Sequence, residues 1–262
     1  MNQRNTLPLS KDQVDLWLVF TDEIQDEALL ARYQDLLTPQ EKQQQARFHF
    51  PRDRHRYLLT RALVREMLSR YAPIAPQDWR FEPSAYGRPL ITNEHPHAPA
   101  ISFNISHTQG LIMLGVVRDR ALGVDTETQS RDAPLEIADR YFSQSESAAL
   151  HALPAAMQRQ RFFELWTLKE SYIKARGMGL SIPLDQFSFD LARAGRVALE
   201  FESGFDDTAS RWRFWQWQVS DHHLAALCLE IASNESVTVT ARRAIPLVRE
   251  HEVELKLLRT SA

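Results

Sequence analysis

The sequence repeats one order of predicted elements, and this repeat limits the folds open to the chain more than any other feature. In each half a run of strand-forming residues comes first, helical patterns follow, and two strand-like runs come last. The first runs lie at residues 14–20 and 122–127, and the paired runs lie at 101–117 and 212–229. The two halves share little sequence identity, so the order of the elements indicates their similarity.

We therefore expect a mixed α/β (α+β) fold of two α/β subdomains related by a pseudo-twofold axis. The expected subdomains span residues 1–117 and 118–262. Clefts between such halves are favoured binding sites, so we expect a ligand site at their interface. Because one chain then carries both halves of the cleft, we also expect a monomer.

Composition argues against several classes of protein. Hydrophobic residues make up 44% of the 262 residues, which is typical of a globular chain. The formal net charge of −3 argues against nucleic-acid binding by bulk charge. The single cysteine, Cys228, permits no internal disulfide and fits a reducing compartment. No apolar stretch resembles a secretory signal or a membrane span, so we expect a soluble cytoplasmic protein without a membrane partner.

Two acidic residues lie on one predicted strand, at 122–127. Because side chains alternate along a strand, Asp125 and Glu127 point to one face, while Leu122 and Val124 point to the other. Two carboxylates about 7 Å apart repel each other unless a cation lies between them, and their oxygens suit Mg²⁺ or Mn²⁺. The motif alone fits equally well a solvated strand end that carries two acids.

A helical pattern from 158 to 176 carries a third acid. Phe162 and Ile173 lie in its apolar stripe, and Glu170 and Lys174 lie one turn apart at the edge of that stripe. Taken alone, the Glu170 and Lys174 pair is typical of an exposed i,i+4 ion pair, worth a few tenths of a kcal/mol. The flanking aromatic residues argue against full exposure of the pair, which favours a place in a site.

A polar segment and several basic residues offer groups for binding an anion. Ser106 and His107 could bind one through the hydroxyl, the imidazole and backbone N–H groups. They could also be a nucleophile and its base, but adjacent residues on an extended chain diverge. Arg56 and Arg88 add positive charge, although each could be a solvated residue. Acids for a metal and basic residues for phosphates together suggest a diphosphate substrate bridged by a divalent ion.

At this point the motifs resemble a known family, the 4′-phosphopantetheinyl transferases. The resemblance rests on Gly-Val-Asp-Thr-Glu at 123–127 and on Trp-Thr-Leu-Lys-Glu-Ser-Tyr-Ile-Lys at 166–174. The segment Phe-Asn-Ile-Ser-His at 103–107, the loop Tyr-Gly-Arg-Pro at 86–89 and the chain length are similar to the larger, Sfp-type branch. The resemblance implies a pseudo-symmetric pair of α/β subdomains with coenzyme A in the cleft. This agrees with the repeated order of predicted elements in the two halves.

The resemblance implies an enzyme of the holo-[acyl-carrier-protein] synthase type. Such an enzyme moves the 4′-phosphopantetheine group of coenzyme A to a serine of an apo acyl, peptidyl or aryl carrier protein, and releases adenosine 3′,5′-bisphosphate. Fatty-acid, polyketide and nonribosomal-peptide synthases all use this modification, and the sequence does not distinguish their carriers. Family members contact the carrier near residues 128–142, where Arg131 and Arg140 are candidate contacts, although an ordinary solvated surface fits as well.

The resemblance also implies roles for individual residues. Asp125, Glu127 and Glu170 would ligate Mg²⁺ together with the diphosphate of coenzyme A. Glu170, or a water held near Glu127, would take the proton from the incoming serine. Lys174 would stabilise charge on the diphosphate as the bond to the leaving phosphate breaks.

Further residues would hold the nucleotide. Ser106 and His107 would bind the 3′-phosphate of coenzyme A. Arg88 stands where family members often have lysine, and Arg56 is the second residue of the family's His-Arg pair and would also face the nucleotide. Some members carry lysines upstream of that pair, and the residues that could replace them here are Lys42, Arg47 and Arg52.

Two other functions fit parts of the pattern. A Mg²⁺-dependent phosphohydrolase could use the same carboxylates, but it has no need of Lys174 one turn after Glu170 behind an anion-binding segment. A carrier-protein binder without activity would be free to lose the acids, which are all present here. The tail after Ser233 has one strand-like run and supports no functional inference.

Overall fold

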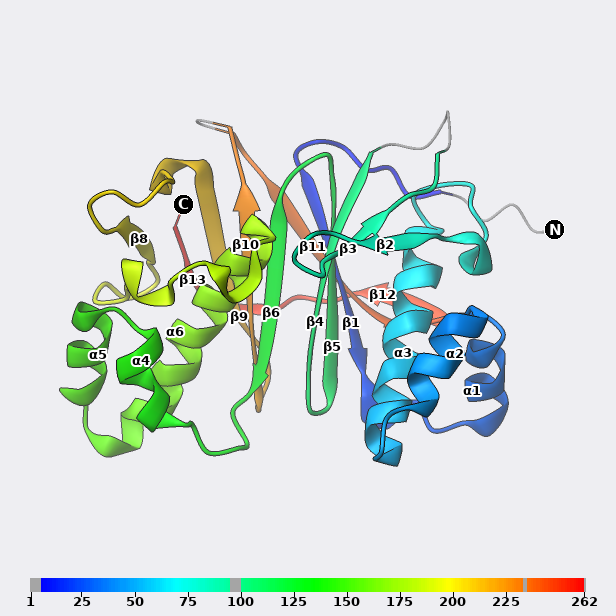
Figure 1. Ribbon diagram of the computed structural model, residues 1–262, viewed down its shortest axis with the longest axis horizontal. Coiled ribbons are helices and arrows are strands. Elements are labelled where there is room, and N and C mark those ends of the chain that lie inside the picture. Colours follow the sequence, from blue (N-terminus) through cyan, green and yellow to red (C-terminus); the bar gives the residue numbers. More distant parts are fainter. Residues whose placement is uncertain (1–5, 95–99, 233–234, 262) are drawn as a thin grey trace. The chain divides into compact units, whose positions relative to one another are not determined.

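The computed structural model describes residues 6–94, 100–232 and 235–261 and confirms the mixed α/β class (Figure 1). The chain divides into two compact units that interleave in the sequence. The first comprises residues 1–102, 110–119 and 237–253, and the second comprises 103–109, 120–236 and 254–262. The division into halves at residues 1–117 and 118–262 and their pseudo-twofold relation stay predictions.

The first unit joins a sheet to three helices. The helices are α1 (Glu27–Gln34), α2 (Pro39–Ala46) and α3 (Pro51–Leu68). The strands are β1 (Gln13–Phe20), β5 (Leu111–Arg118), β11 (Thr238–Ile245) and β12 (Arg249–Glu252), with a separate hairpin of β2 (Phe81–Pro83) and β3 (Pro89–Ile91). The sheet order is β12-β11-β1-β5-β4, and β4 (Ile101–Thr108) passes into the second unit at Phe103.

A buried polar group fastens the C-terminal part of the chain to β1. Strand β11 pairs in parallel with β1. Asp15 on β1 is fully buried and accepts hydrogen bonds from Tyr71 Oη at 2.6 Å and from Arg242 Nη1 at 2.7 Å. A buried carboxylate needs such partners, so β11, in the tail for which the sequence supports no role, is an internal strand of this sheet.

The second unit places a long helix on a four-stranded sheet. Its helices are α4 (Ala138–Tyr141), α5 (Gln144–His151) and α6 (Ala155–Arg176). The sheet order is β13-β9-β10-β6, from strands β13 (Lys256–Thr260), β9 (Trp212–Ser220), β10 (His223–Glu230) and β6 (Leu122–Thr128). A separate pair joins β7 (Phe187–Asp190) to β8 (Ala198–Phe201). Helix α6 packs on β6 and β10 (Figure 1).

Local sequence signals set the ends of these helices. Capping boxes at Thr38 and Ser143 begin α2 and α5, and each is closed by a glutamate three residues on. Helix α6 is capped at its C-terminal end by Gly177, whose φ of 67° is the left-handed conformation that glycine adopts readily. The helix begins three residues before the predicted start at Gln158. None of the described helices is both long enough and apolar enough to cross a membrane.

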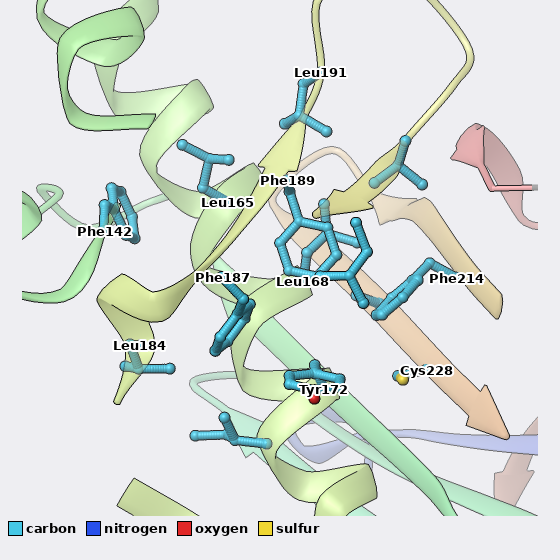
Figure 2. Close-up of a cluster of buried hydrophobic side chains, with 14 of the residues drawn as sticks. Phe142, Leu165, Leu168, Tyr172, Leu184, Phe187, Phe189, Leu191, Phe214 and Cys228 are labelled. Carbon is cyan, nitrogen blue, oxygen red and sulfur yellow. The ribbon is translucent and has the colours of Figure 1, made fainter. Parts of the chain in front are cut away.

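An aromatic core holds α6 in place within the second unit. Figure 2 shows Leu165, Leu168 and Tyr172 of α6 packed among side chains of β7 and the sheet. The ring of Tyr172 lies 4.8 Å from that of Phe187, in an edge-to-face arrangement. This packing orients the opposite edge of the helix, which carries Glu170 and Lys174.

Gly123 on β6 allows the backbone of α6 to lie directly against the strand. A Cβ atom at this position would lie 2.0 Å from the carbonyl oxygen of Ser171 and 2.3 Å from the amide nitrogen of Ala175. Both are backbone atoms, so no side chain can move aside to make room. The glycine therefore sets the distance between β6 and the helix residues beside it.

We expect Gly123→Ala to destabilise the protein by on the order of 3 kcal/mol, because the methyl group forces strand and helix apart. The measurement is urea unfolding followed by circular dichroism. The control is Gly195→Asn, since Gly195 has a φ of 74° and open space around it, and asparagine tolerates that conformation. Equal losses in the two variants would contradict the close-approach explanation.

Candidate active site

The structure brings most of the predicted site residues into one unit. The second unit contains the residues predicted for the metal, the diphosphate and the 3′-phosphate, namely Asp125, Glu127, Glu170, Lys174, Ser106 and His107. Arg56 and Arg88 belong to the first unit.

Asp125 is the centre of the hydrogen-bonded group. It lies on β6, is 5% exposed, and its Oδ1 accepts hydrogen bonds from Lys174 Nζ at 2.6 Å and from Ser106 Oγ at 2.9 Å. The sequence predicts Glu170 as the partner of Lys174, and it does not predict this ion pair with Asp125. Lys174 thus joins α6 to β6 through a charge-assisted hydrogen bond.

Polar side chains of β4 cap the backbone of β6. Three alternate residues of β4 accept hydrogen bonds from alternate backbone N–H groups of β6, at 3.0 to 3.3 Å. The pairs are Asn104 with Val124, Ser106 with Thr126, and Thr108 with Thr128. We call these three side chains the β4 ladder. It satisfies donors at the edge of the sheet and fixes the strand that carries Asp125 and Glu127.

Ser106 and His107 differ in exposure, as expected for neighbours on a strand. Ser106 is buried at 6% exposure, whereas His107 is exposed. Successive strand residues point to opposite faces, so the two side chains do not act as a nucleophile and its base. Ser106 contacts both Asp125 and Lys174.

Burial and mutual repulsion raise the pKa values of two of the three acids. Burial, and then the charge of Asp125, raise the pKa of Glu170 to about 7, against a smaller opposing effect of Lys174. Burial and Asp125 also raise the pKa of Glu127, while Arg131 Nη2 at 3.0 Å from its Oε2 acts the other way. The three carboxylates therefore share one electrostatic environment.

The donor chemistry of this group suits a divalent cation. Asp125 Oδ2 is buried and accepts no hydrogen bond from any residue that the structure describes. An unpartnered buried carboxylate oxygen is costly, and a hard cation such as Mg²⁺ would satisfy it. Within the described ranges, no three His, Cys, Asp or Glu side chains are arranged to hold a metal ion as they stand. The residues fit a cation by their chemistry, and Asp125, Glu127 and Glu170 would hold it.

Lys169, in the same motif as Glu170, has a structural place that the sequence did not predict. Its side chain is fully buried and its Nζ lies 2.7 Å from Glu146 Oε2. It also donates hydrogen bonds to the carbonyl oxygens of Leu184 at 2.7 Å and Phe187 at 2.6 Å. Glu146 closes the capping box of α5 as well, so this ion pair ties α5, α6 and β7 together.

The two arginines considered for the carrier surface have different surroundings. Arg131 pairs with Glu127 and places its guanidinium 5.2 Å from the centre of the Phe163 ring. Arg140 is exposed and lies over the ring of Tyr141 at 5.3 Å. Arg131 is therefore bound to a predicted metal ligand, whereas Arg140 is directed to the surface.

The basic residues of the first unit lie around α3 and the β2–β3 hairpin. Arg56 on α3 forms an ion pair with Asp53 at 2.9 Å. Arg88 is half-buried, and burial lowers its pKa. The three residues named as possible replacements for upstream lysines are exposed: Lys42, Arg47 and Arg52.

Comparison with known proteins identifies the family on both parts of the chain. The model of the 4′-phosphopantetheinyl transferase superfamily matches residues 121–228. The model described as 4′-phosphopantetheinyl transferase, N-terminal, matches residues 25–117. The first match includes Asp125, Glu127, Glu170 and Lys174, and the second includes Arg56 and Arg88.

Curated relatives agree with these matches. The 4′-phosphopantetheinyl transferase Sfp of Bacillus subtilis (strain 168) is 35% identical over 75% of this chain and 84% of its own length. The 4′-phosphopantetheinyl transferase HetI of Nostoc sp. is 30% identical over 85% of this chain and 90% of its own. The solved holo-[acyl-carrier-protein] synthase of Thermotoga maritima overlaps 43% of this chain and 64% of that one, with a TM-score of 0.35 and 20% identity. The chain belongs to the 4′-phosphopantetheinyl transferase superfamily.

Proposed function

We propose that this enzyme transfers the 4′-phosphopantetheine group of coenzyme A to a serine of an apo carrier protein, with Mg²⁺, and releases adenosine 3′,5′-bisphosphate. The observation that carries the proposal is the contact of Lys174 with Asp125 beside Glu170. It places an ammonium group and a carboxyl group that titrates near neutral pH around one buried carboxylate. This set can bind a diphosphate and accept a proton.

The acids have two tasks in this reaction. Asp125, Glu127 and Glu170 would hold Mg²⁺ (or Mn²⁺), which when bound neutralises charge on the diphosphate. Glu170, or a water held near Glu127, takes the proton of the serine hydroxyl. Glu170 is the better candidate because burial brings its pKa to about 7. A general base works best when its pKa lies near the pH at which the enzyme operates.

The transfer itself exchanges one phosphorus–oxygen bond for another. The serine oxygen forms a bond to the phosphorus on the pantetheine side of the diphosphate. The bond from that phosphorus to the bridging oxygen breaks, and the adenosine 3′,5′-bisphosphate leaves with the bond's electron pair. Lys174 stabilises the negative charge that develops on this leaving group.

Other residues would hold the nucleotide end of coenzyme A. His107 is exposed on β4 and is proposed to bind the 3′-phosphate, with Arg56 and Arg88 as further cations. The family resemblance assigns Ser106 to the 3′-phosphate as well, but its hydroxyl contacts Asp125 and Lys174. The buried, unbridged Cys228 fits action in the cytoplasm, and we expect a monomer because one chain carries both matched regions.

The direct test is mass spectrometry of apo acyl, peptidyl and aryl carrier proteins incubated with coenzyme A, Mg²⁺ and the enzyme. We expect the wild type to add one phosphopantetheine mass to at least one carrier. Asp125→Ala and Glu170→Ala should each abolish transfer at saturating Mg²⁺, whereas Asp221→Ala, at an exposed acid of the β9–β10 turn, should retain it. Failure with every carrier would refute the proposed function, and near-normal turnover in either site variant would refute the metal site.

The stability of the metal-free protein should depend on Glu170. Its pKa is 4.5 ordinarily and about 7 in the folded protein, so between these values the folded state binds more protons than the unfolded state. The stabilising contribution is complete below pH about 4.5 and is lost as the pH rises through about 7. Urea unfolding in EDTA should show that the free energy of unfolding of the wild type falls from pH 5 to pH 8. In Glu170→Gln it should fall by a smaller amount.

Mg²⁺ should oppose this loss, because a ligand that binds only the folded state stabilises it. We expect the melting temperature at about pH 8 to rise with added Mg²⁺ in the wild type and to change little in Asp125→Asn. An equal Mg²⁺ response in both proteins would place the cation elsewhere.

His107→Ala should mainly raise the KM for coenzyme A, since an anchor of the 3′-phosphate contributes equally to substrate and transition-state binding. Steady-state kinetics with coenzyme A and with 3′-dephospho-coenzyme A measure this. The variant should lose most of the preference for coenzyme A. A loss confined to kcat would contradict the role of His107 as a phosphate anchor.

A further inference from the structure

The hydroxyl of Ser106 uses its whole hydrogen-bonding capacity inside the protein. It donates to Asp125 Oδ1 at 2.9 Å and accepts from Lys174 Nζ at 2.9 Å and from the backbone N–H of Thr126 at 3.3 Å. A hydroxyl has one hydrogen and two lone pairs. A phosphate oxygen needs a donor, and the single donor of Ser106 is already directed at a carboxylate.

The position of Ser106 on β4 explains why it is held so firmly. It is the middle member of the β4 ladder, between Asn104 and Thr108, and it is buried. The exposed His107 points to the other face of the strand. A phosphate group bound by His107 is therefore not on the face from which Ser106 projects.

We propose that Ser106 is a positioning residue that joins Lys174 to Asp125, and that it is not a ligand of the 3′-phosphate. This inference rests on the proposed transferase function. Ser106 and Lys174 both bind Oδ1 of Asp125, so the carboxylate is oriented with its other oxygen, Oδ2, turned away from them. Oδ2 is the buried oxygen with no partner among the described residues, and it stays available to a cation.

The same arrangement directs the ammonium group of Lys174. One of its hydrogens is taken by Asp125 and one by Ser106. A lysine side chain has four rotatable bonds and loses much rotamer freedom when it is fixed. Two acceptors from two strands restrict it far more than one acceptor would. Without Ser106, Lys174 would keep its charge, but the orientation of its side chain would be restrained by one acceptor fewer.

The test compares Ser106→Ala with Thr108→Val, which removes a neighbouring member of the β4 ladder that contacts neither Asp125 nor Lys174. Transfer is measured with coenzyme A and with 3′-dephospho-coenzyme A. We expect Ser106→Ala to lower kcat by on the order of 10- to 100-fold with both donors, by the same factor. Thr108→Val should lower the melting temperature and lower kcat much less than Ser106→Ala does. A rise in KM for coenzyme A alone would overturn the inference and restore Ser106 to the 3′-phosphate.

A second measurement does not depend on activity. In the metal-free protein, acetic anhydride labelling followed by mass spectrometry reports how readily each lysine amine reacts. Ser106→Ala should speed the labelling of Lys174 several-fold relative to the exposed Lys11, because a less restrained amine reacts more readily. Thr108→Val should leave this ratio as in the wild type. An unchanged ratio in Ser106→Ala would overturn the inference.

If Ser106→Ala does not fold, Ser106→Cys replaces it, since the thiol fills the space but is only a weak donor and acceptor. We expect Ser106→Cys to show the same loss of kcat and the same faster labelling of Lys174. If the wild type modifies no carrier protein, the transferase proposal fails, while the labelling ratio still decides whether Ser106 restrains Lys174.

Discussion

The contact of helix α6 with strand β6 at Gly123 sets the geometry on which the candidate active site depends. Because Gly123 has no Cβ, the backbone of β6 lies directly against the backbone of α6. Glu170 and Lys174 therefore come to lie beside Asp125. The aromatic core fixes the helix from the other side, through Tyr172 and its neighbours. The acids and the ammonium group thus stand on rigid elements, as precise chemistry requires.

The sequence predicts the parts of this structure that depend on nearby residues. Strand β1, the capping boxes at Thr38 and Ser143 and the end of α6 at Gly177 are each specified within a few positions of the chain. Strand alternation likewise predicts that Ser106 and His107 diverge. The family follows from motifs at fixed spacing, and the comparisons confirm it.

The rest depends on partners that are far apart in the sequence. Nothing local shows that Lys174 pairs with Asp125, or that Lys169 crosses the core to Glu146. The β4 ladder joins residues about twenty positions apart through side chain and backbone, which no periodicity reveals. Its only trace in the sequence is a row of polar residues at every second position of β4, where an apolar face is usual.

The place of β11 has a consequence for how the chain is made. Strand β11 lies between β12 and β1 and pairs in parallel with a strand more than two hundred residues earlier. During synthesis β1 can pair with β5 and Asp15 with Tyr71, but β11 and Arg242 join them only after residues 238–252 have left the ribosome. One edge of β1 therefore stays unpaired while more than two hundred residues are made, which leaves it open to non-native pairing in that time.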